Sequence, residues 1–304
     1  MPRILVVGSA NVDFTVQAPR LPQPGETVTD GTLLVNHGGK GANQAVAARR
    51  LGADVRFIAC VGDDASGVAI RAALAREGIE TGAITATPEA ATGTALIVVD
   101  GDGRNQIVVA PGANRCLAVE HVRARAADIA WAEIVLCQLE TPLPTVRWVL
   151  ERARQHRITT VLNPAPVREA ASELFGLVDY LTPNEGEAER LSGTKVSDRQ
   201  AAARAGAALR ASGATTVIVT LGAAGAVTCN PDGTLCMPGF AVTAVDTTAA
   251  GDAFNGALAV ALAEGGELGA AVRFANAAAA LACTRRGAQP SLPARDEVER
   301  LLRS

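Results

Sequence analysis

One stretch of the sequence places a carboxylate beside very small residues at the start of an apolar helix. Residues 246–257 read Asp-Thr-Thr-Ala-Ala-Gly-Asp-Ala-Phe-Asn-Gly-Ala, and a helix is expected to open at about Ala253. Asp252 then lies in the first turn, where the amides have no partners inside the helix and the helix dipole is positive. The small side chains let an anion approach these amides closely. The predicted anion hole consists of the amides of Ala249, Ala250, Gly251 and Asp252.

Such an arrangement is suited to phosphoryl transfer. The amides stabilise charge on the transferring phosphoryl group, and the carboxylate accepts the proton of the attacking hydroxyl. The other interpretation is that Asp252 only caps its helix and that its neighbours are small for packing. These residues alone do not decide between the two.

A glycine-rich segment near the N-terminus suggests a second ligand-binding loop. Residues 36–44 read Asn-His-Gly-Gly-Lys-Gly-Ala-Asn-Gln. Glycine lets a backbone approach a ligand, and Asn43, in the first turn of the next helix, can donate and accept hydrogen bonds to vicinal hydroxyls. Lys40 is one of only two lysines in the chain. The spacing is not that of a Walker A loop, and an ordinary glycine-rich turn into a helix is the alternative.

Further polar residues follow predicted strands. Asn11 and Asp13 come after the first strand, where α/β folds collect binding residues, although an Asx turn gives the same pattern. Residues 220–225, Thr-Leu-Gly-Ala-Ala-Gly, can hold a phosphate or nucleotide but lack the G-x-G-x-x-G fingerprint of an NAD-dependent oxidoreductase. Asn184 and Glu187 share one helix face. Glu187 could hold the water shell of Mg²⁺, and the alternative is a solvated acidic helix start that includes Glu185 and Glu189.

The elements that would position these residues alternate along the chain. Short β-branched runs alternate with alanine-rich helical stretches, which predicts an α/β fold with a mostly parallel sheet and helices on both faces. The strand runs are continuously apolar, as expected for strands buried on both sides. The predicted strands are Ile4–Val7, Val55–Val61, Ile134–Gln138, Thr159–Leu162, Tyr180–Leu181 and Val217–Thr220. The predicted helices are 42–51, 66–77, 145–156, 185–191 and 198–211, with further buried helix in 257–282.

Two stretches interrupt this alternation. Residues 92–111 contain two strand runs around Asp100-Gly101-Asp102-Gly103, a β-hairpin signature whose glycines can take positive φ. Residues 14–37 are rich in proline and are expected to be loop-like. Open α/β sheets bind ligands at the carboxyl ends of their strands, so these insertions predict a small antiparallel sheet acting as a lid, with a decorative hairpin as the alternative. The predicted organisation is one domain, 1–304, with the lid inserted at about 14–38 and 92–111.

Composition narrows the classes of function. The 304 residues carry a formal net charge of −3 and no basic block, which argues against nucleic acid or acidic membranes as partners. Six cysteines form no C-x-x-C pair, and three histidines offer no zinc spacing, so the thiols are expected to be incidental in a reducing compartment. No apolar run approaches the roughly 20 residues of a membrane span. The run Ile4–Val7 is too short for a signal peptide, so a cytoplasmic protein is expected.

Taken together and in this order, the motifs resemble the ribokinases within the phosphofructokinase-B-type carbohydrate kinases. Residues 38–45 resemble the first signature of that family, and residues 246–252 resemble the second. Residues 163–166, 182–185 and 287–291 resemble the ribokinases rather than the wider family. The resemblance extends from Val7 to Ser291 and implies a three-layer α/β sandwich with a small β-sheet lid.

The resemblance also implies roles for individual residues, with Asp252 as the catalytic base. The sugar site would be lined by Asn11, Asp13, Gly39, Lys40, Asn43, Glu140 and Asp252. The nucleotide site would be lined by Asn184, Thr220, Gly222, Gly225, Gly251 and Asn276, the last in place of the His of some ribokinases. Glu187 would act through hydrated Mg²⁺. An activating K⁺ would be held by Asp246, Thr248, Ala282, Arg285, Gly287 and Ser291, several of them through carbonyls.

The implied reaction is transfer of the γ-phosphoryl group of ATP to the 5-hydroxyl of D-ribose. A sister kinase acting on deoxyribose or another furanose is the alternative, whereas a nucleoside is disfavoured because only Phe14 could stack on a base near the lid. A catalytically silent sugar-binding regulator is expected to lack Asp252 or Gly251, and both are present. An isolated small sheet leaves edges and an apolar face exposed, so a homodimer formed through the lid is predicted.

Overall fold

A large, mostly parallel sheet forms the centre of the protein. The computed structural model describes residues 1–102 and 104–303, and in this part nine strands form the sheet in the order β13-β12-β11-β10-β9-β8-β1-β4-β5. Their bounds are β1 Arg3–Val7, β4 Asp54–Gly62, β5 Ile84–Thr87, β8 Ile134–Cys137, β9 Thr159–Leu162, β10 Tyr180–Leu181, β11 Thr216–Thr220, β12 Ala226–Asn230 and β13 Gly233–Met237. Neighbours from β5 to β11 pair in parallel, and β12 and β13 add an antiparallel edge. The predicted fold class is confirmed, although β5, β12 and β13 were not predicted.

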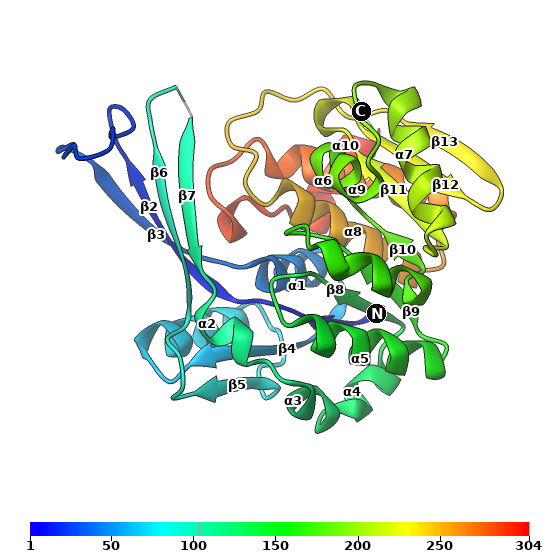
Figure 1. Cartoon of the computed structure of the whole chain (residues 1–304), viewed down its shortest axis with the longest axis horizontal. Coiled ribbons are helices and arrows are strands. Elements are labelled where there is room, and N and C mark those ends of the chain that lie inside the picture. The colour runs from blue at the N-terminus through cyan, green and yellow to red at the C-terminus, as the bar shows by residue number, and fades with distance from the viewer. Residues whose placement is uncertain (103, 304) are drawn as a thin grey trace.

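Helices cover both faces of this sheet (Figure 1). Alternate residues of β1 belong to two different buried clusters. Ile4 and Val6 belong to the cluster that includes residues of α1, α8 and α9, whereas Leu5 and Val7 belong to the cluster that includes residues of α5 and α7. A strand that buries both of its faces needs a continuously apolar sequence, which is what the chain supplies. The helices are α1 Lys40–Arg50, α2 Ala65–Arg76, α3 Val119–Arg123, α4 Ala126–Trp131, α5 Leu143–Gln155, α6 Glu185–Ser192, α7 Arg199–Ala211, α8 Ala250–Ala263, α9 Leu268–Ala282 and α10 Arg295–Arg303.

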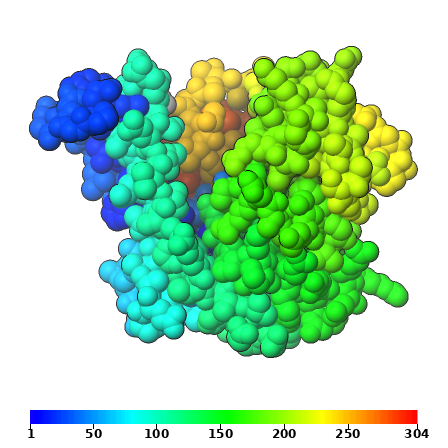
Figure 2. Space-filling view, viewed as in Figure 1, coloured from blue at the N-terminus to red at the C-terminus, as the bar shows by residue number. Residues whose placement is uncertain are grey.

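A second sheet of four strands stands apart from the main body and is called the lid sheet below (Figure 1). Its order is β3-β2-β6-β7, with β2 Asn11–Gln17, β3 Thr32–Gly38, β6 Gly93–Val99 and β7 Asn105–Ala110. The β2–β3 and β6–β7 pairs are antiparallel, and β2–β6 is parallel. In the space-filling view the surface is hollowed between these blue and cyan strands and the rest of the molecule (Figure 2).

The predicted loop at 14–37 is wrong at its two ends. Its first and last residues belong to β2 and β3, and only residues 18–31 between them lie outside strands. The prolines that suggested a loop are confined to that connection, while the alternating Val12, Phe14 and Val16 before it follow strand periodicity. The small sheet is therefore larger than expected and contains one parallel pair.

The turn of the β6–β7 hairpin is held by a side chain and not by a left-handed glycine at Gly101. The carboxylate of Asp100 accepts hydrogen bonds from the amides of Asp102 and Arg104 at 3.0 and 2.9 Å, and from Nε of Arg104 at 2.8 Å. Gly101 does not have a positive φ, and Gly103 lies outside the described residues.

Among the described residues, no helix is both long and apolar enough to cross a membrane.

Candidate active site

The catalytic candidate Asp252 lies where helices α8 and α1 pack against each other. Helix α8 begins at Ala250, three residues before the predicted position, and Asp252 lies in its first turn. The helices approach closely because Gly256 lacks a side chain: a Cβ there would lie 2.6 Å from Cβ of Ala47. Asp252 is only 6% exposed, and its two carboxylate oxygens accept hydrogen bonds from Asn43 Nδ2 at 2.8 Å and Gln44 Nε2 at 2.9 Å. The base candidate and the glycine-rich loop therefore meet in one place.

The amides before Asp252 differ from one another in their partners. Ala249 is in the left-handed region, with φ 61°, which turns the chain sharply into the helix. The amide of Ala250 donates to the carbonyl of Thr247 at 3.2 Å, so the predicted four-amide hole is reduced by one donor. Among the described residues, the amides of Ala249, Gly251 and Asp252 have no such backbone partner. Three amides thus remain to bind an anion.

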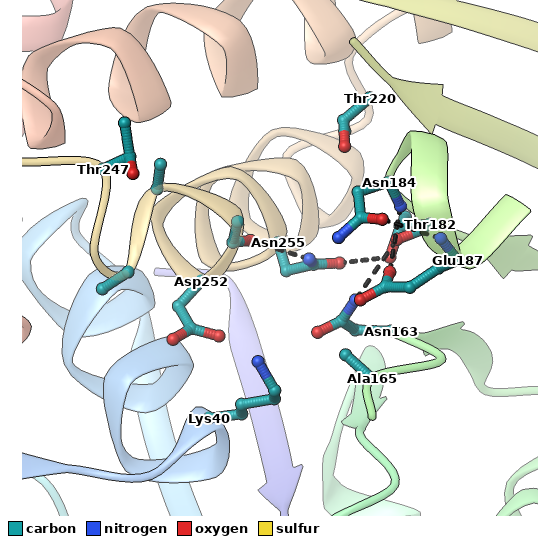
Figure 3. A pocket seen from close by; sticks show the side chains of 13 residues that line it. Lys40, Asn163, Ala165, Thr182, Asn184, Glu187, Thr220, Thr247, Asp252 and Asn255 are labelled. Carbon is teal, nitrogen blue, oxygen red and sulfur yellow. Dashed lines mark hydrogen bonds between the residues drawn. The ribbon is translucent and has the colours of Figure 1, made fainter. Parts of the chain in front are cut away.

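The charge of Asp252 is set by opposing effects. Burial raises the pKa of its carboxyl, while the Lys40 ammonium and the Asn43 and Gln44 amides lower it, and the net shift is upward. Burial lowers the pKa of Lys40, but the Asp252, Glu140 and Glu187 carboxylates outweigh that effect and leave the pKa above its ordinary value. Figure 3 shows Lys40 reaching from α1 toward the Asp252 carboxylate. A cation is thus held among carboxylates beside the free amides.

The loop that leads into α1 depends on Gly39. This residue has φ 86° and ψ 131°, a conformation that side chains disfavour, and it precedes the first helical residue, Lys40. A Cβ at Gly39 would lie 2.8 Å from both Cα of Ala10 and N of Asn11. The glycine therefore lets the loop lie directly against the start of β2.

The predicted sugar-binding residues gather around Asp252. Asn11 and Asp13 are not in an Asx turn, as one alternative had it, but in β2 of the lid sheet. Burial, Glu140 and Asp252 together raise the pKa of Asp13 to about 6. Glu140 accepts a hydrogen bond from the amide of Lys40 at 3.0 Å and another from the Ser9 hydroxyl. The glycine-rich loop, β2 and Glu140 thus form one polar cluster.

A pocket of about 200 Å³ opens beside this cluster (Figure 3). Asp252 and Lys40 lie on one side of it, and Asn184 and Glu187 of α6 lie on the other. The pocket thus joins two of the predicted sugar residues, Lys40 and Asp252, to three of the predicted nucleotide residues, Asn184, Thr220 and Gly251. Its lining residues are Lys40, Asn163, Ala165, Thr182, Asn184, Glu187, Thr220, Thr247, Ala249, Ala250, Gly251, Asp252 and Asn255.

Asn184 and Glu187 form a capping box at the start of α6. Oδ1 of Asn184 accepts from the amide of Glu187 at 2.8 Å, and one carboxylate oxygen of Glu187 accepts from the amide of Asn184 at 2.9 Å. The second carboxylate oxygen remains for another ligand, and burial raises the pKa of this group. Oxygen donors of this kind fit hydrated Mg²⁺. No cluster of three or more His, Cys, Asp or Glu that could hold a metal occurs in the described residues.

Three predicted nucleotide residues do not line the pocket. Gly222 and Gly225 form the turn after β11, with φ of 51° and 94°. A Cβ at Gly225 would lie 2.1 Å from the carbonyl oxygen of Met237. Asn276, on α9, is buried and donates to the carbonyl of Pro238 at 3.2 Å. Asn276 therefore tethers the chain that leaves β13.

The predicted potassium ligands lie on two segments that are joined by hydrogen bonds. Asp246 Oδ1 accepts from the amide and hydroxyl of Thr248 at 2.9 and 2.6 Å, and Oδ2 accepts from the amide of Gly287 at 2.9 Å. Burial raises the pKa of Asp246, but these hydrogen bonds outweigh it and leave the pKa below its ordinary value. The guanidinium of Arg285 pairs with Glu297. Because a guanidinium is a cation without an acceptor, only the carbonyl of this residue is available to K⁺. The Ser291 hydroxyl donates to the carbonyl of Ala288 at 2.8 Å.

Several residues of the site were not assigned a role from the sequence. Oε1 of Gln44 accepts a hydrogen bond from Nε2 of Gln138, and Nε2 of Gln44 also donates to Oδ1 of Asn163 at 3.2 Å. Thr182 donates to Asn255, which in turn donates to the carbonyl of Gly251 at 2.8 Å. Asn163 and Thr182 follow strands β9 and β10 directly, and polar residues at carboxyl ends of parallel strands are a usable signal. The remaining contacts join residues far apart in the chain and leave no local pattern.

Comparison with known proteins agrees with this geometry. The model of the pfkB family carbohydrate kinases matches residues 1–295. A ribokinase of Haemophilus influenzae is 45% identical over 97% of this chain and 96% of its own length, and a deoxyribokinase of Salmonella typhi is 35% identical over 98% of each. The structure of Arabidopsis thaliana ribokinase complexed with ribose and ATP matches with a TM-score of 0.92, at 33% identity over 100% of this chain and 99% of that one. With both predicted signature loops meeting at one pocket and a family match along almost its whole length, the chain belongs to the pfkB family of carbohydrate kinases.

Proposed function

We propose that this protein is a ribokinase, which transfers the γ-phosphoryl group of ATP to the 5-hydroxyl of D-ribose. The observation that carries the proposal is the contact of the buried Asp252 carboxylate with Asn43 of the glycine-rich loop, at 2.8 Å, beside three free amides at the start of α8. A base, an anion hole and a polar cluster for a polyol thus share one cleft. The identity to ribokinases along the whole chain supports this choice of sugar.

In the proposed reaction the sugar lies between the lid sheet and α8. Asn11, Asp13, Gly39, Asn43 and Glu140 hold its ring hydroxyls, so that its primary hydroxyl faces Asp252. Asp252 takes the proton of that hydroxyl as the oxygen attacks the γ-phosphorus, and the bond to the β-phosphate oxygen breaks to release ADP. The amides of Ala249, Gly251 and Asp252 stabilise charge on the transferring group. Lys40 adds a positive charge on the same side.

The nucleotide would lie along the other side of the pocket, against Asn184, Thr220 and the turn formed by Gly222 and Gly225, while Asn276 supports the neighbouring chain. Mg²⁺, when bound, would neutralise phosphate charge. Glu187 would hold its water shell with the carboxylate oxygen that makes no hydrogen bond in the capping box. The Glu187 carboxylate also helps to keep the pKa of Lys40 above its ordinary value.

A potassium ion would fit between the 246–248 and 282–291 segments, where carboxylate and carbonyl oxygens form a hard donor set. When bound, it would add positive charge behind the anion hole. Asp246 already fixes the direction of the chain that leads to Ala249 by accepting from Thr248, so these segments orient the amides. Ala282, Arg285, Gly287 and Ser291 would contribute mainly through their backbones.

A panel of sugars with purified protein and coupled ADP detection tests the proposal. D-ribose is expected to give the highest kcat/KM, above 2-deoxyribose, other furanoses and adenosine. Deoxyribose is the specific competitor because a deoxyribokinase matches the whole chain at 35% identity. Activity with deoxyribose alone would make this chain a deoxyribokinase, and absence of ADP release with every sugar would favour a sugar-binding regulator.

The same assay tests the cation. Turnover in a potassium salt is expected to exceed turnover in an equimolar tetramethylammonium salt, because a large organic cation cannot enter a site made of carbonyls. Equal rates in both salts would remove the potassium site from this account and leave the choice of sugar untouched.

We also propose that the lid sheet forms a homodimer. Residues paired across a sheet point to the same side, so Phe14, Val35, Leu96 and Val108 share the face opposite Asp13. Val35, Leu96 and Val108 are 54%, 57% and 68% exposed. A second lid sheet packed on this face would remove it from water.

In this proposal residues 1–304 form one catalytic domain with its lid, and the location in the cytoplasm stays a prediction.

Replacing Leu96 and Val108 with glutamate is expected to halve the mass measured by light scattering, from twice 31.0 kDa to that of one chain, because buried carboxylates would oppose association. Val68→Glu is the matched control, since Val68 is 67% exposed on α2 and lies outside the lid sheet. A wild-type protein that is monomeric at micromolar concentration would contradict the proposal, as would a double variant that keeps the mass of the dimer.

A further inference from the structure

A buried pair of asparagines joins the segment that follows β7 to the start of β2. Asn114 lies in the short helical turn after β7, at residues Gly112–Cys116, and is 1% exposed. Its Oδ1 accepts from the amide of Ala10 at 2.9 Å, and its Nδ2 donates to Oδ1 of Asn11 at 2.7 Å. One side chain thus ties the end of the lid to the residues that precede and begin β2.

The orientation of both amides follows from one backbone group. The amide of Ala10 can only donate, so Asn114 must present its oxygen there and its nitrogen to Asn11. That nitrogen can only donate, so Asn11 must receive it with Oδ1. The NH₂ group of Asn11 is consequently turned the other way. Within residues 1–102 and 104–303, this group has no hydrogen-bond acceptor, although Asn11 is only 4% exposed.

The surroundings leave room for this pair and for little else. Gly93 begins β6 and pairs with Asn11 in the lid sheet. A Cβ at Gly93 would lie 2.2 Å from Oδ1 of Asn11 and 2.3 Å from Nδ2 of Asn114. The nitrogen of this NH₂ group is not enclosed by the protein and has no acceptor in the described residues, so it is open to a ligand. Asn11 shares its face of β2 with Asp13. The nearby Glu140 and Asp252 carboxylates raise the pKa of Asp13, so this face of β2 is directed toward them.

We propose that Asn114 is a positioning residue for sugar recognition, which fixes the Asn11 amide so that its NH₂ group donates to an oxygen of the sugar. The inference rests on the proposed function, because it takes the polar cluster around Asp252 as the sugar site. Asn114 touches no substrate itself and acts through Asn11. The same contact makes the sugar site sensitive to the position of the lid, since the pair spans the start of β2 and the chain that leaves β7.

The test is Asn114→Asp, which keeps an oxygen for the Ala10 amide and places a second oxygen against Oδ1 of Asn11. Asn11 is then expected to flip and to present its oxygen to the sugar in place of its NH₂ group. The KM for ribose should rise roughly tenfold, as for one lost hydrogen bond to a buried group, with kcat and the KM for ATP changed less than about threefold. Asn230→Asp, a remote change of the same charge at the end of β12, should leave all three values unchanged.

A cycle with Asn11→Ala separates positioning from a general structural effect. In the Asn11→Ala background, Asn114→Asp should raise the KM for ribose no further, because the group that it turns is gone. An equal rise in both backgrounds, or no rise in either, would overturn the inference while the wild-type turnover still supports the kinase. Absence of ribose turnover in the wild type would overturn the proposed function and this inference with it. If Asn114→Asp does not fold, Asn114→Ala serves in the same cycle, with a smaller expected rise.

Discussion

Asp252→Asn is expected to lower kcat by roughly 10²–10⁴-fold, the usual effect of removing a general base, while the affinity for the sugar is kept. The carboxylate is buried and is the group on which Asn43 and Gln44 converge. An amide has the same shape but cannot accept the hydroxyl proton. Steady-state kinetics and sugar titration by calorimetry measure the two effects separately.

The local hydrogen bonds indicate that this variant will fold. Asn43 Oδ1 is buried without a partner, so Asn43 can flip and accept from the new NH₂ group. Gln44 cannot flip without losing both Gln138 and Asn163. Asp296→Asn, the same change in the first turn of the exposed helix α10, is the control and should keep full activity. Turnover near the wild-type value in Asp252→Asn would reject the role of Asp252.

Gly39→Ala is expected to lower kcat/KM for the sugar by about 10²-fold, because a displacement of about 1 Å at a reacting group has that effect. The left-handed backbone alone would cost roughly 1–3 kcal/mol with a side chain. In addition, the new Cβ would collide with the backbone of Ala10 and Asn11. The loop must then move away from β2 and carry Lys40 and Asn43 with it.

Gly265→Ala distinguishes the collision from the backbone strain. Gly265 has φ 77° and nothing within 4 Å of a Cβ, and it follows the far end of α8, roughly 20 Å from Asp252 at 1.5 Å per residue. This control should lower the free energy of unfolding in denaturant by about 1 kcal/mol and leave kcat/KM unchanged. If Gly39→Ala lowered stability alone and kept the sugar kinetics, the close contact with β2 would have no part in binding.

The fold and the two main loops could be predicted because their signals are local. Continuous apolar runs marked the buried strands, and small residues before Asp252 marked a helix start open to anions. The strands β2 and β3 were not predicted because prolines between them dominate residues 14–37 and because β3 has no alternation of apolar and polar residues. The free amides were overcounted because a turn bond from Ala250 to Thr247 depends on the backbone path and not on residue type.

The supporting contacts of the site could not be read from the sequence. Gln44 and Asp252 are 208 positions apart, and Ser9 and Glu140 are 131 apart, so only the folded chain brings them together. The sequence around Asn114 has no feature that distinguishes it from other polar residues after a hairpin. Its burial and its two hydrogen bonds nevertheless orient Asn11, a predicted sugar contact. Such residues are specified by the packing of distant elements, and no spacing rule identifies them.

The close crossing of α1 and α8 at Gly256 divides the enzyme into parts with different freedoms. Asp252 lies on α8, and the Asn43 and Gln44 side chains that donate to it lie on α1. Because these two helices are closely packed, the groups proposed for phosphoryl transfer are held rigidly. Asn11 and Asp13 belong instead to a projecting sheet with its own supports. Substitutions in the projecting sheet therefore alter the share of the sugar contacts made by Asn11 and Asp13 and leave the helices that carry the base in place.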